Sequence, residues 1–254
     1  QEPPFGYTTW DGELVSQTLG DVSSHQVWRV LRKHKISLSR RRSWCVSTDP
    51  EFAAKAADVV GLYLNPPENA VVLSVDEKPC IQALERQQGY LKLPNGRALT
   101  GYSHEYKRHG TLTLIAALQV ATGQVTAKDY KHHRRIEFLD FLDELVAAYP
   151  DQELHVIVDN LKTHNIEATP WKQRHPNVFM HFIPTHASWL NQIEIWFSIL
   201  WRKCLRGANS PSARHLREAI MNFIQVFNQT ATPFVWTASE VHPKRLHKYA
   251  DLCK

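Results

Sequence analysis

Two short apolar segments, rich in β-branched residues, each lead directly into an aspartate. Residues 70–75 (AVVLSV) precede Asp76, and residues 154–158 (LHVIV) precede Asp159. Runs of this kind are typical of strands buried inside a sheet. Ligands of open α/β sheets gather at the carboxyl ends of the strands, so the two aspartates predict a functional site at one sheet edge.

The surrounding pattern predicts an α/β domain in which helices flank a mixed sheet. Early strands in a meander are followed by βαβ units, an order that favours this architecture. Further strands are expected over 80–84, 111–119, 124–130 and 178–183, and helices over 49–63, 136–149, 188–205 and 211–228. Residues 87–110 carry a Pro-Asn-Gly turn and are expected to form a long loop or hairpin.

The N-terminal region is strongly basic. Two short predicted helices, separated by a turn at Gly20-Asp21, resemble a helix-turn-helix whose second helix enters the major groove of DNA. No acidic residue lies between Asp21 and Asp49, and the net charge of +5 also favours a polyanionic partner. The alternative is a basic surface helix of the main domain. The predicted DNA contacts are Arg29, Arg32, Lys33, Arg40, Arg41 and Arg42.

These patterns divide the chain into three parts. Residues 1–48 are expected to form a partial helix-turn-helix unit, 49–67 a connector helix and linker, and 68–254 the main domain with a C-terminal helix and tail. No apolar run is long enough for a membrane span, and no signal peptide is visible. The chain begins at Gln1, so upstream sequence is expected to be missing. The four cysteines form no CxxC pair, which indicates reduced intracellular thiols.

A third acid, Glu194, lies beside the apolar stripe of a predicted helix. Leu190 and Phe197 belong to that stripe, and Glu194 follows Leu190 by four residues. A carboxylate in such a place needs a partner, because burying a bare charge is costly. The partner is either a divalent cation shared with Asp76 and Asp159 or a nearby cation such as Arg202.

Three carboxylates suit Mg²⁺ or Mn²⁺, hard ions that bind oxygen ligands together with water and phosphate. Two such ions, about 3.5–4 Å apart, would clamp a phosphodiester for in-line attack. No convincing Ser-His-Asp or Cys-His constellation is present. The acids therefore predict metal-dependent phosphoryl transfer without a nucleophilic side chain.

Three segments carry a resemblance to a known family: residues 75–78 (VDEK), 158–165 (VDNLKTHN) and 184–197 (PTHASWLNQIEIWF). They resemble the DDE transposases of the mariner superfamily, in the bacterial insertion-sequence branch. The 34 residues at positions 160–193, between Asp159 and Glu194, match the spacing typical of that superfamily. The resemblance extends over about residues 52–236, and more loosely over the first 50.

The resemblance implies an RNase H-like fold in which Asp76, Asp159 and Glu194 form the catalytic triad with two Mg²⁺ or Mn²⁺ ions. It also implies cut-and-paste transposition: cleavage of double-stranded DNA at terminal inverted repeats and insertion at a TA target, by a homodimer or higher assembly. A cytoplasmic, nucleoid-associated bacterial protein is expected. The chain departs from relatives in Gln192, where eukaryotic members often have proline, and in having one plausible helix-turn-helix instead of two.

Three more residues near these motifs are candidates for contacts with DNA. Lys78 is expected to contact a phosphate, or else to pair with Glu77 or Glu85. His164 and His186 are expected to contact the scissile phosphate or to orient a metal-bound water, or else to have structural roles. For the chain as a whole, the alternatives to an active transposase are a DNA-binding protein with a decayed catalytic domain and a structure-selective nuclease.

Overall fold

The computed structural model describes residues 3–34, 36, 38, 47–238 and 241. The chain divides into two compact units, Gln1–Cys45 and Val46–Lys254. The predicted DNA contacts Arg40, Arg41 and Arg42 lie outside the described residues. No helix within the described ranges is both long and apolar enough to cross a bilayer.

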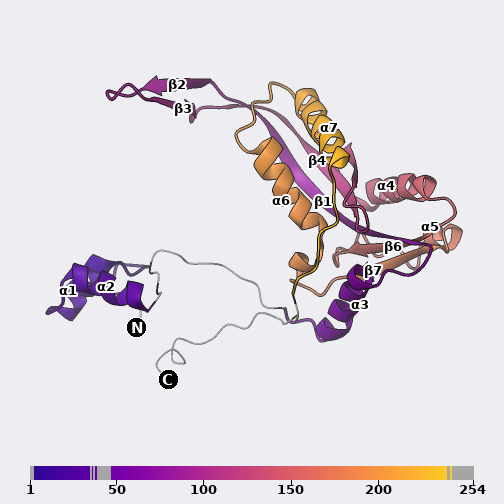
Figure 1. Ribbon diagram of the computed structural model, residues 1–254, viewed down its shortest axis with the longest axis horizontal. Helices are drawn as coiled ribbons and strands as arrows, with labels where there is room; N and C mark the ends of the chain where they lie inside the picture. Colours follow the sequence, from indigo (N-terminus) through magenta and orange to yellow (C-terminus); the bar gives the residue numbers. More distant parts are fainter. Residues whose placement is uncertain (1–2, 35, 37, 39–46, 239–240, 242–254) are drawn as a thin grey trace. The chain divides into compact units, whose positions relative to one another are not determined.

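The first unit contains the two predicted short helices, α1 (Gly12–Leu19) and α2 (Ser24–Lys33) (Figure 1). Ser23 caps α2, and its side chain and that of Gln26 form a reciprocal capping box. The helices approach closely at Gly12, where a Cβ atom would lie only 2.3 Å from Nε1 of Trp28. The prediction of two helices joined by a turn is confirmed.

The second unit is built on a five-stranded mixed sheet in the order β5-β4-β1-β6-β7 (Figure 1). Antiparallel pairing joins β1 to β4 and β4 to β5, whereas β1, β6 and β7 run parallel. The predicted meander followed by βαβ units is confirmed. The strands are β1 (Ala70–Glu85), β4 (Lys107–Gln119), β5 (Val125–Tyr130), β6 (Glu153–Val158) and β7 (Val178–Phe182).

One strand, β1, replaces the two that were predicted over 70–75 and 80–84. Its ladder with β4 is irregular between Lys78 and Ile81, and Cys80 has a positive φ of 56°. Pro79 has no N–H to donate, so the regular pattern breaks there without ending the strand. The sequence therefore showed the irregularity but not the continuity of the pairing across it.

Between β1 and β4 the chain forms a hairpin of β2 (Gln88–Lys92) and β3 (Ala98–Tyr102), which confirms the hairpin alternative. It extends away from the five-stranded sheet (Figure 1). Gly96 in the turn has a φ of 79°, a conformation that favours glycine.

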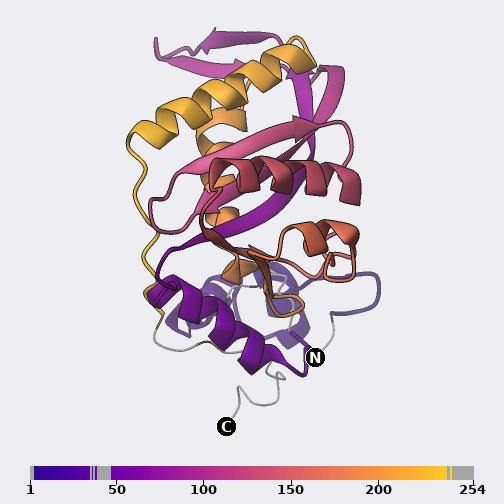
Figure 2. The same ribbon diagram turned by 90° about the vertical axis from the view of Figure 1, so that its right-hand side faces the viewer.

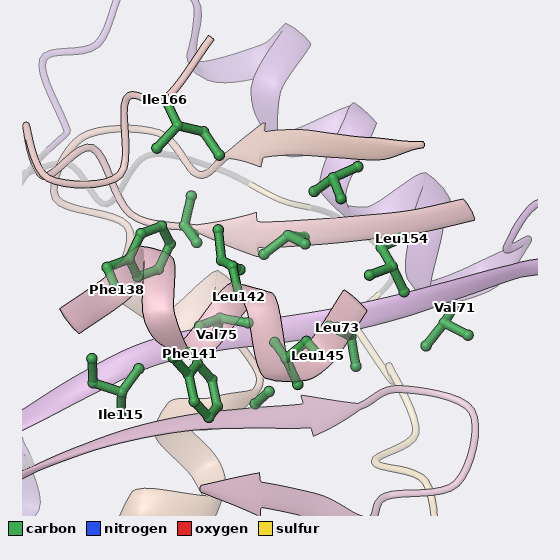
Figure 3. Packing of buried hydrophobic residues seen from close by; sticks show 14 of the residues in the cluster. Val71, Leu73, Val75, Ile115, Phe138, Phe141, Leu142, Leu145, Leu154 and Ile166 are labelled. Atoms are coloured by element: carbon green, nitrogen blue, oxygen red, sulfur yellow. The ribbon is translucent and has the colours of Figure 1, made fainter. Parts of the chain in front are cut away.

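Helices cover both faces of the sheet (Figure 2). On one face, α4 (Arg135–Ala148) and α5 (Pro170–Arg174) pack on β1, β4 and β6. Figure 3 shows Phe138, Phe141, Leu142 and Leu145 of α4 against this face. On the other face lie α3 (Phe52–Leu64), α6 (Ile193–Leu200) and α7 (Ala213–Gln229).

The single helix predicted over 188–205 is broken into a 3₁₀ turn, η1 (Ser188–Leu190), then α6 and a π-helical turn, η2 (Trp201–Leu205). The first break is at Asn191, whose backbone is extended (φ −83°, ψ 110°). The Asn191 side chain binds β1. This tertiary contact competes with the helix, and helical periodicity does not show it.

Candidate functional site

Asp76 and Asp159 come from neighbouring parallel strands, as predicted. The last paired residues of β1 and β6 are Ser74 and Ile157, so extending this register by two residues sets Asp76 level with Asp159. Asp76 is opposite Ala116 of β4, which belongs to the core formed with α6 and α7. Asp76 therefore points to the α6 side of the sheet.

Glu194 lies in the first turn of α6, on the same side of the sheet. The negative charge of Glu194 acts on the carboxyl group of Asp76, as does that of Asp159. Among the described residues, Glu194 has no side-chain hydrogen bond or ion pair, and the guanidinium of Arg202 binds the carbonyl oxygen of Ser198 instead. The structure therefore places Asp159 and Glu194 within electrostatic reach of Asp76 and shows no pairing of Glu194 with Arg202.

Burial dominates the electrostatics of Asp76, whose exposed fraction is 9%. Burial raises the pKa of this carboxyl to about 7, and the charges of Asp159, Glu77 and Glu194 add to the increase. A hydrogen bond of 2.8 Å from the backbone N–H of Glu77 opposes it. A cation placed among these acids would relieve the repulsion and hold Asp76 ionised.

The second carboxylate, Asp159, is bound by His164, for which a structural role was the predicted alternative to a contact with DNA. His164 is fully buried, and its Nδ1 lies 2.8 Å from Oδ1 of Asp159. Its Nε2 lies 2.9 Å from Oε1 of Glu77, which is also buried. Burial alone would lower the pKa of His164, but Asp159 and Glu77 outweigh burial and raise it to about 10. His164 is therefore an imidazolium at neutral pH, and it lowers the pKa of Asp159 against the opposing effect of burial.

These contacts correct the prediction that His164 touches DNA. Both ring nitrogens face carboxylates and the side chain has no exposed surface, so a phosphate has no access to it. His186, the other predicted histidine contact, is exposed in the turn between β7 and η1. The structure thus separates two histidines that the sequence treated alike.

Lys78 is half-buried on β1, two residues beyond Asp76. Its ammonium group lies 5.5 Å from the centre of the Phe197 ring in α6. The alternative that Lys78 pairs with Glu77 or Glu85 is not seen in the described part of the chain, where those acids bind His164 and His109. Lys78 therefore presents a positive charge near the acids.

In the first unit, Arg29, Arg32 and Lys33 are exposed on α2. Their spacing, i, i+3 and i+4, puts them on one face of the helix. Their role in DNA binding stays a prediction.

Sequence reasoning missed two features of the site. Glu77 was considered only as a possible partner of Lys78; it points to the opposite face of β1 from Asp76, but His164 connects it to Asp159. Asn191 was treated only as part of a motif, although it is fully buried and bound to β1. The only available signal was their position inside the VDEK and LNQIE segments.

The acids do not form a complete cage by themselves. Across residues 3–34, 36, 38, 47–238 and 241, no three His, Cys, Asp or Glu side chains converge closely enough to hold an ion. Mg²⁺ is usually held by one or two carboxylates together with waters and substrate phosphates, and it does not require such a cage. The donor set, all carboxylate oxygens with one acid unpartnered, fits a hard divalent cation.

Solved structures of Mos1 transposase resemble this fold. A Mos1 paired-end complex with left transposon end has a TM-score of 0.58 at 13% identity, covering 85% of this chain and 67% of that chain. The Mos1 strand transfer complex has a TM-score of 0.60 at 13% identity, with 85% and 66% covered. The chain thus spans about two thirds of the Mos1 chains. The likeness confirms the predicted RNase H-like mixed sheet flanked by helices.

No curated protein matches the chain. A family model described as DDE superfamily endonuclease matches residues 71–217, more than half of the chain. The matched segment contains Asp76, Asp159 and Glu194 and includes the strands, hairpin and helices from β1 to the start of α7. The chain belongs to the DDE superfamily endonucleases.

Proposed function

We propose that this chain is a cut-and-paste DNA transposase that uses Asp76, Asp159 and Glu194 as its metal-binding catalytic acids. The observation that carries the proposal is the placement of these acids on one face of the sheet, where the pairing of β1 with β6 ends, with Asp76 buried among negative charges. Such an arrangement is unfavourable without a cation. Its position, where the parallel pairing of β1 and β6 ends, supports a role in chemistry.

The proposed cofactors are two Mg²⁺ or Mn²⁺ ions, held by oxygens of the three acids. A Mos1 paired-end complex with Mg shares the fold (TM-score 0.60, 11% identity, covering 85% of this chain and 67% of that chain). When bound, the ions would activate a water or hydroxyl for attack on a phosphodiester and stabilise the leaving oxygen.

The protein's own side chains prepare this site. His164 keeps Asp159 ionised and oriented, and the other ring nitrogen of His164 binds Glu77. Lys78, held over the ring of Phe197, is placed to contact a phosphate of the DNA near the acids. His186 is exposed near the start of the α6 segment and is proposed as a further DNA contact.

The proposed partner is double-stranded DNA: terminal inverted repeats as substrate and a TA dinucleotide as target. The exposed face of α2 with Arg29, Arg32 and Lys33 supports an electrostatic contact with DNA. The similar Mos1 structures are a paired-end complex and a strand transfer complex, which supports a homodimer or higher assembly on paired ends. We also propose that the chain acts on nucleoid DNA in a bacterial cytoplasm.

The test is cleavage of DNA that carries the element's own ends, with and without Mn²⁺, by wild type and by Glu194→Gln. The substitution keeps the size of the side chain and removes one negative charge. Cleavage is expected to fall by about three orders of magnitude or more, DNA binding is expected to be nearly unchanged, and the stability without metal is expected to hold or rise.

Glu218→Gln on α7 is the matched control, because Glu218 is exposed and, in the described part of the chain, pairs with Arg214. It should cleave like wild type. If Glu194→Gln lowers metal-free stability and reduces cleavage only in proportion to the folded fraction, Glu194 is structural and the proposal fails. If wild type cuts any branched DNA equally well and never joins ends to a target, the chain is a structure-selective nuclease.

A further inference from the structure

Three polar side chains interrupt the apolar layer between β1, α3 and the start of α6. Ser74 of β1 and Asn191 are both fully buried. Nδ2 of Asn191 donates a hydrogen bond of 2.9 Å to the carbonyl oxygen of Val75, and the hydroxyl of Ser74 donates to Oδ1 of Asn191. The hydroxyl of Tyr63, from α3, donates to the carbonyl oxygen of Leu190 over 2.8 Å.

These bonds end very close to two of the acids. On β1 they engage Ser74 and Val75, the two residues immediately before Asp76. On the other side they engage Asn191, whose carbonyl oxygen accepts the backbone N–H of Glu194 over 3.1 Å. The two carboxylates are thus linked through hydrogen bonds of Asn191 and short stretches of chain.

An apolar contact would not fix the alignment of β1 and α6 in the same way. Packing of apolar groups tolerates small shifts and rotations, whereas paired hydrogen bonds require one alignment of donor and acceptor. Burying two polar side chains also costs free energy that is recovered only when their polar atoms form hydrogen bonds. Asn191 moreover holds an extended backbone at the break before α6, which directs the first turn of that helix toward β1.

We infer that Asn191, with Ser74, is a positioning residue that sets the separation of Asp76 and Glu194. The inference rests on the proposed function, in which both acids bind the same metal centre. Asn191 does not touch the acids' reacting oxygens. It acts by fixing where the first turn of α6 lies along β1, and outer partners of this kind commonly change metal affinity when they are removed.

A second asparagine in the chain provides a matched control. Asn228, near the end of α7, also bonds a strand through both ends of its carboxamide. Its Nδ2 donates to the carbonyl oxygen of Val125, and its Oδ1 accepts the N–H of Val125, each over 2.9 Å. Neither α7 nor β5 carries one of the three acids.

The experiment measures Mn²⁺ affinity by calorimetric titration of the full chain, without DNA, at a temperature where circular dichroism shows each variant folded. Asn191→Ala and Asn228→Ala are expected to lose comparable thermal stability. Only Asn191→Ala is expected to weaken Mn²⁺ binding, by about tenfold or more, and Ser74→Ala should weaken it several-fold. Asn228→Ala is expected to bind within about twofold of wild type.

The inference is wrong if Asn191→Ala and Ser74→Ala bind Mn²⁺ like Asn228→Ala. If Asn191→Ala does not fold, Ser74→Ala decides by the same comparison, because it removes one hydroxyl and leaves the bond from Asn191 to Val75. Glu194→Gln separates the two levels of failure. If Glu194→Gln binds Mn²⁺ as tightly as wild type, the proposed function fails. If Glu194→Gln weakens Mn²⁺ binding and the Asn191→Ala and Ser74→Ala variants do not, only the positioning role fails.

Discussion

The two faces of β1 are built on different principles. On the face covered by α4, Val71, Leu73 and Val75 belong to a continuous apolar core (Figure 3). On the face covered by α3 and α6, Val72 is followed by Ser74 and Asp76, both buried. The first face is stabilised by the burial and packing of apolar surface. The second is organised by a few directional hydrogen bonds and by charge.

The difference indicates that one face of β1 contributes mainly to stability and the other to the proposed site. The apolar face gains free energy from burial and needs no particular partner for any one residue. The polar face needs a partner for each group, because an unsatisfied buried polar atom is costly. His164 connects the two faces, because it reaches Glu77 on the apolar side and Asp159 at the site.

The largest stability effect is expected at that connection. His164→Gln should destabilise the metal-free protein by about 3–5 kcal/mol near pH 6, because it leaves two carboxylates without their buried cation. The folded-state pKa of about 10 lies above the ordinary 6.5, so this stabilisation is complete below pH 6.5 and is lost as pH rises through 10. Urea unfolding at pH 6 and pH 10 measures the difference.

His175→Gln is the control for this variant, because the ring of His175 packs at a tilt against Trp171 and lies 3.6 Å from Asp143. It should change stability by less than about 1 kcal/mol. An equal loss in His164→Gln at both pH values would show that His164 contributes packing and not charge.

The apolar face is tested by Leu73→Ala. Leu73 is 1% exposed, so the change should cost about 2–5 kcal/mol through lost burial and a cavity. Mn²⁺ affinity of the folded protein should be unchanged. Leu91→Ala on β2, where the leucine is 69% exposed, should have little effect on stability. A large loss of Mn²⁺ affinity in Leu73→Ala would show that the two faces are not separable.

The polar face is tested by pH. The folded-state pKa of Asp76, about 7, lies above its ordinary 3.8, so the unfolded chain loses its proton first and metal-free stability falls as pH rises from about 4 to 7. Asp76→Asn should remove this dependence and be more stable than wild type at pH 8, by up to about 4 kcal/mol. Unfolding in EDTA at several pH values measures the metal-free stability. Saturating Mn²⁺ should restore the stability that wild type loses at high pH. A wild-type curve that is flat over this range contradicts the expectation.

The smallest effect on folding is expected in the first unit. Changing Arg29, Arg32 and Lys33 together to Ala should leave stability nearly unchanged. DNA affinity should fall, and the slope of log affinity against log salt should flatten by about 3, because each phosphate contact contributes about 0.9. Binding measured by fluorescence anisotropy at several salt concentrations tests this.

The control is a triple variant of cations that already pair with acids, namely Lys128, Arg134 and Arg214. It removes the same formal charge from the second unit. If both triples flatten the slope equally, α2 is an ordinary basic surface helix.

The sequence alone predicted the strands, the order of most elements and the three acids, since each is a local signal. An apolar β-branched run that ends in Asp is visible in a few residues. The break in the 188–205 helix and the continuity of β1 across Pro79 were predicted wrongly, because each depends on a partner segment distant in the chain.

By itself, the sequence determined on which strands and helix the three acids lie, because strand and helix periodicities are properties of the local chain. Only the tertiary structure decided what those residues meet. His164 stands 87 positions from Glu77, and Asn191 stands 117 from Ser74, and both pairs form only when the sheet and helices assemble. Local periodicity carries no information about such pairings, because hydrogen bonds and buried charges are satisfied by whichever groups the fold brings into reach.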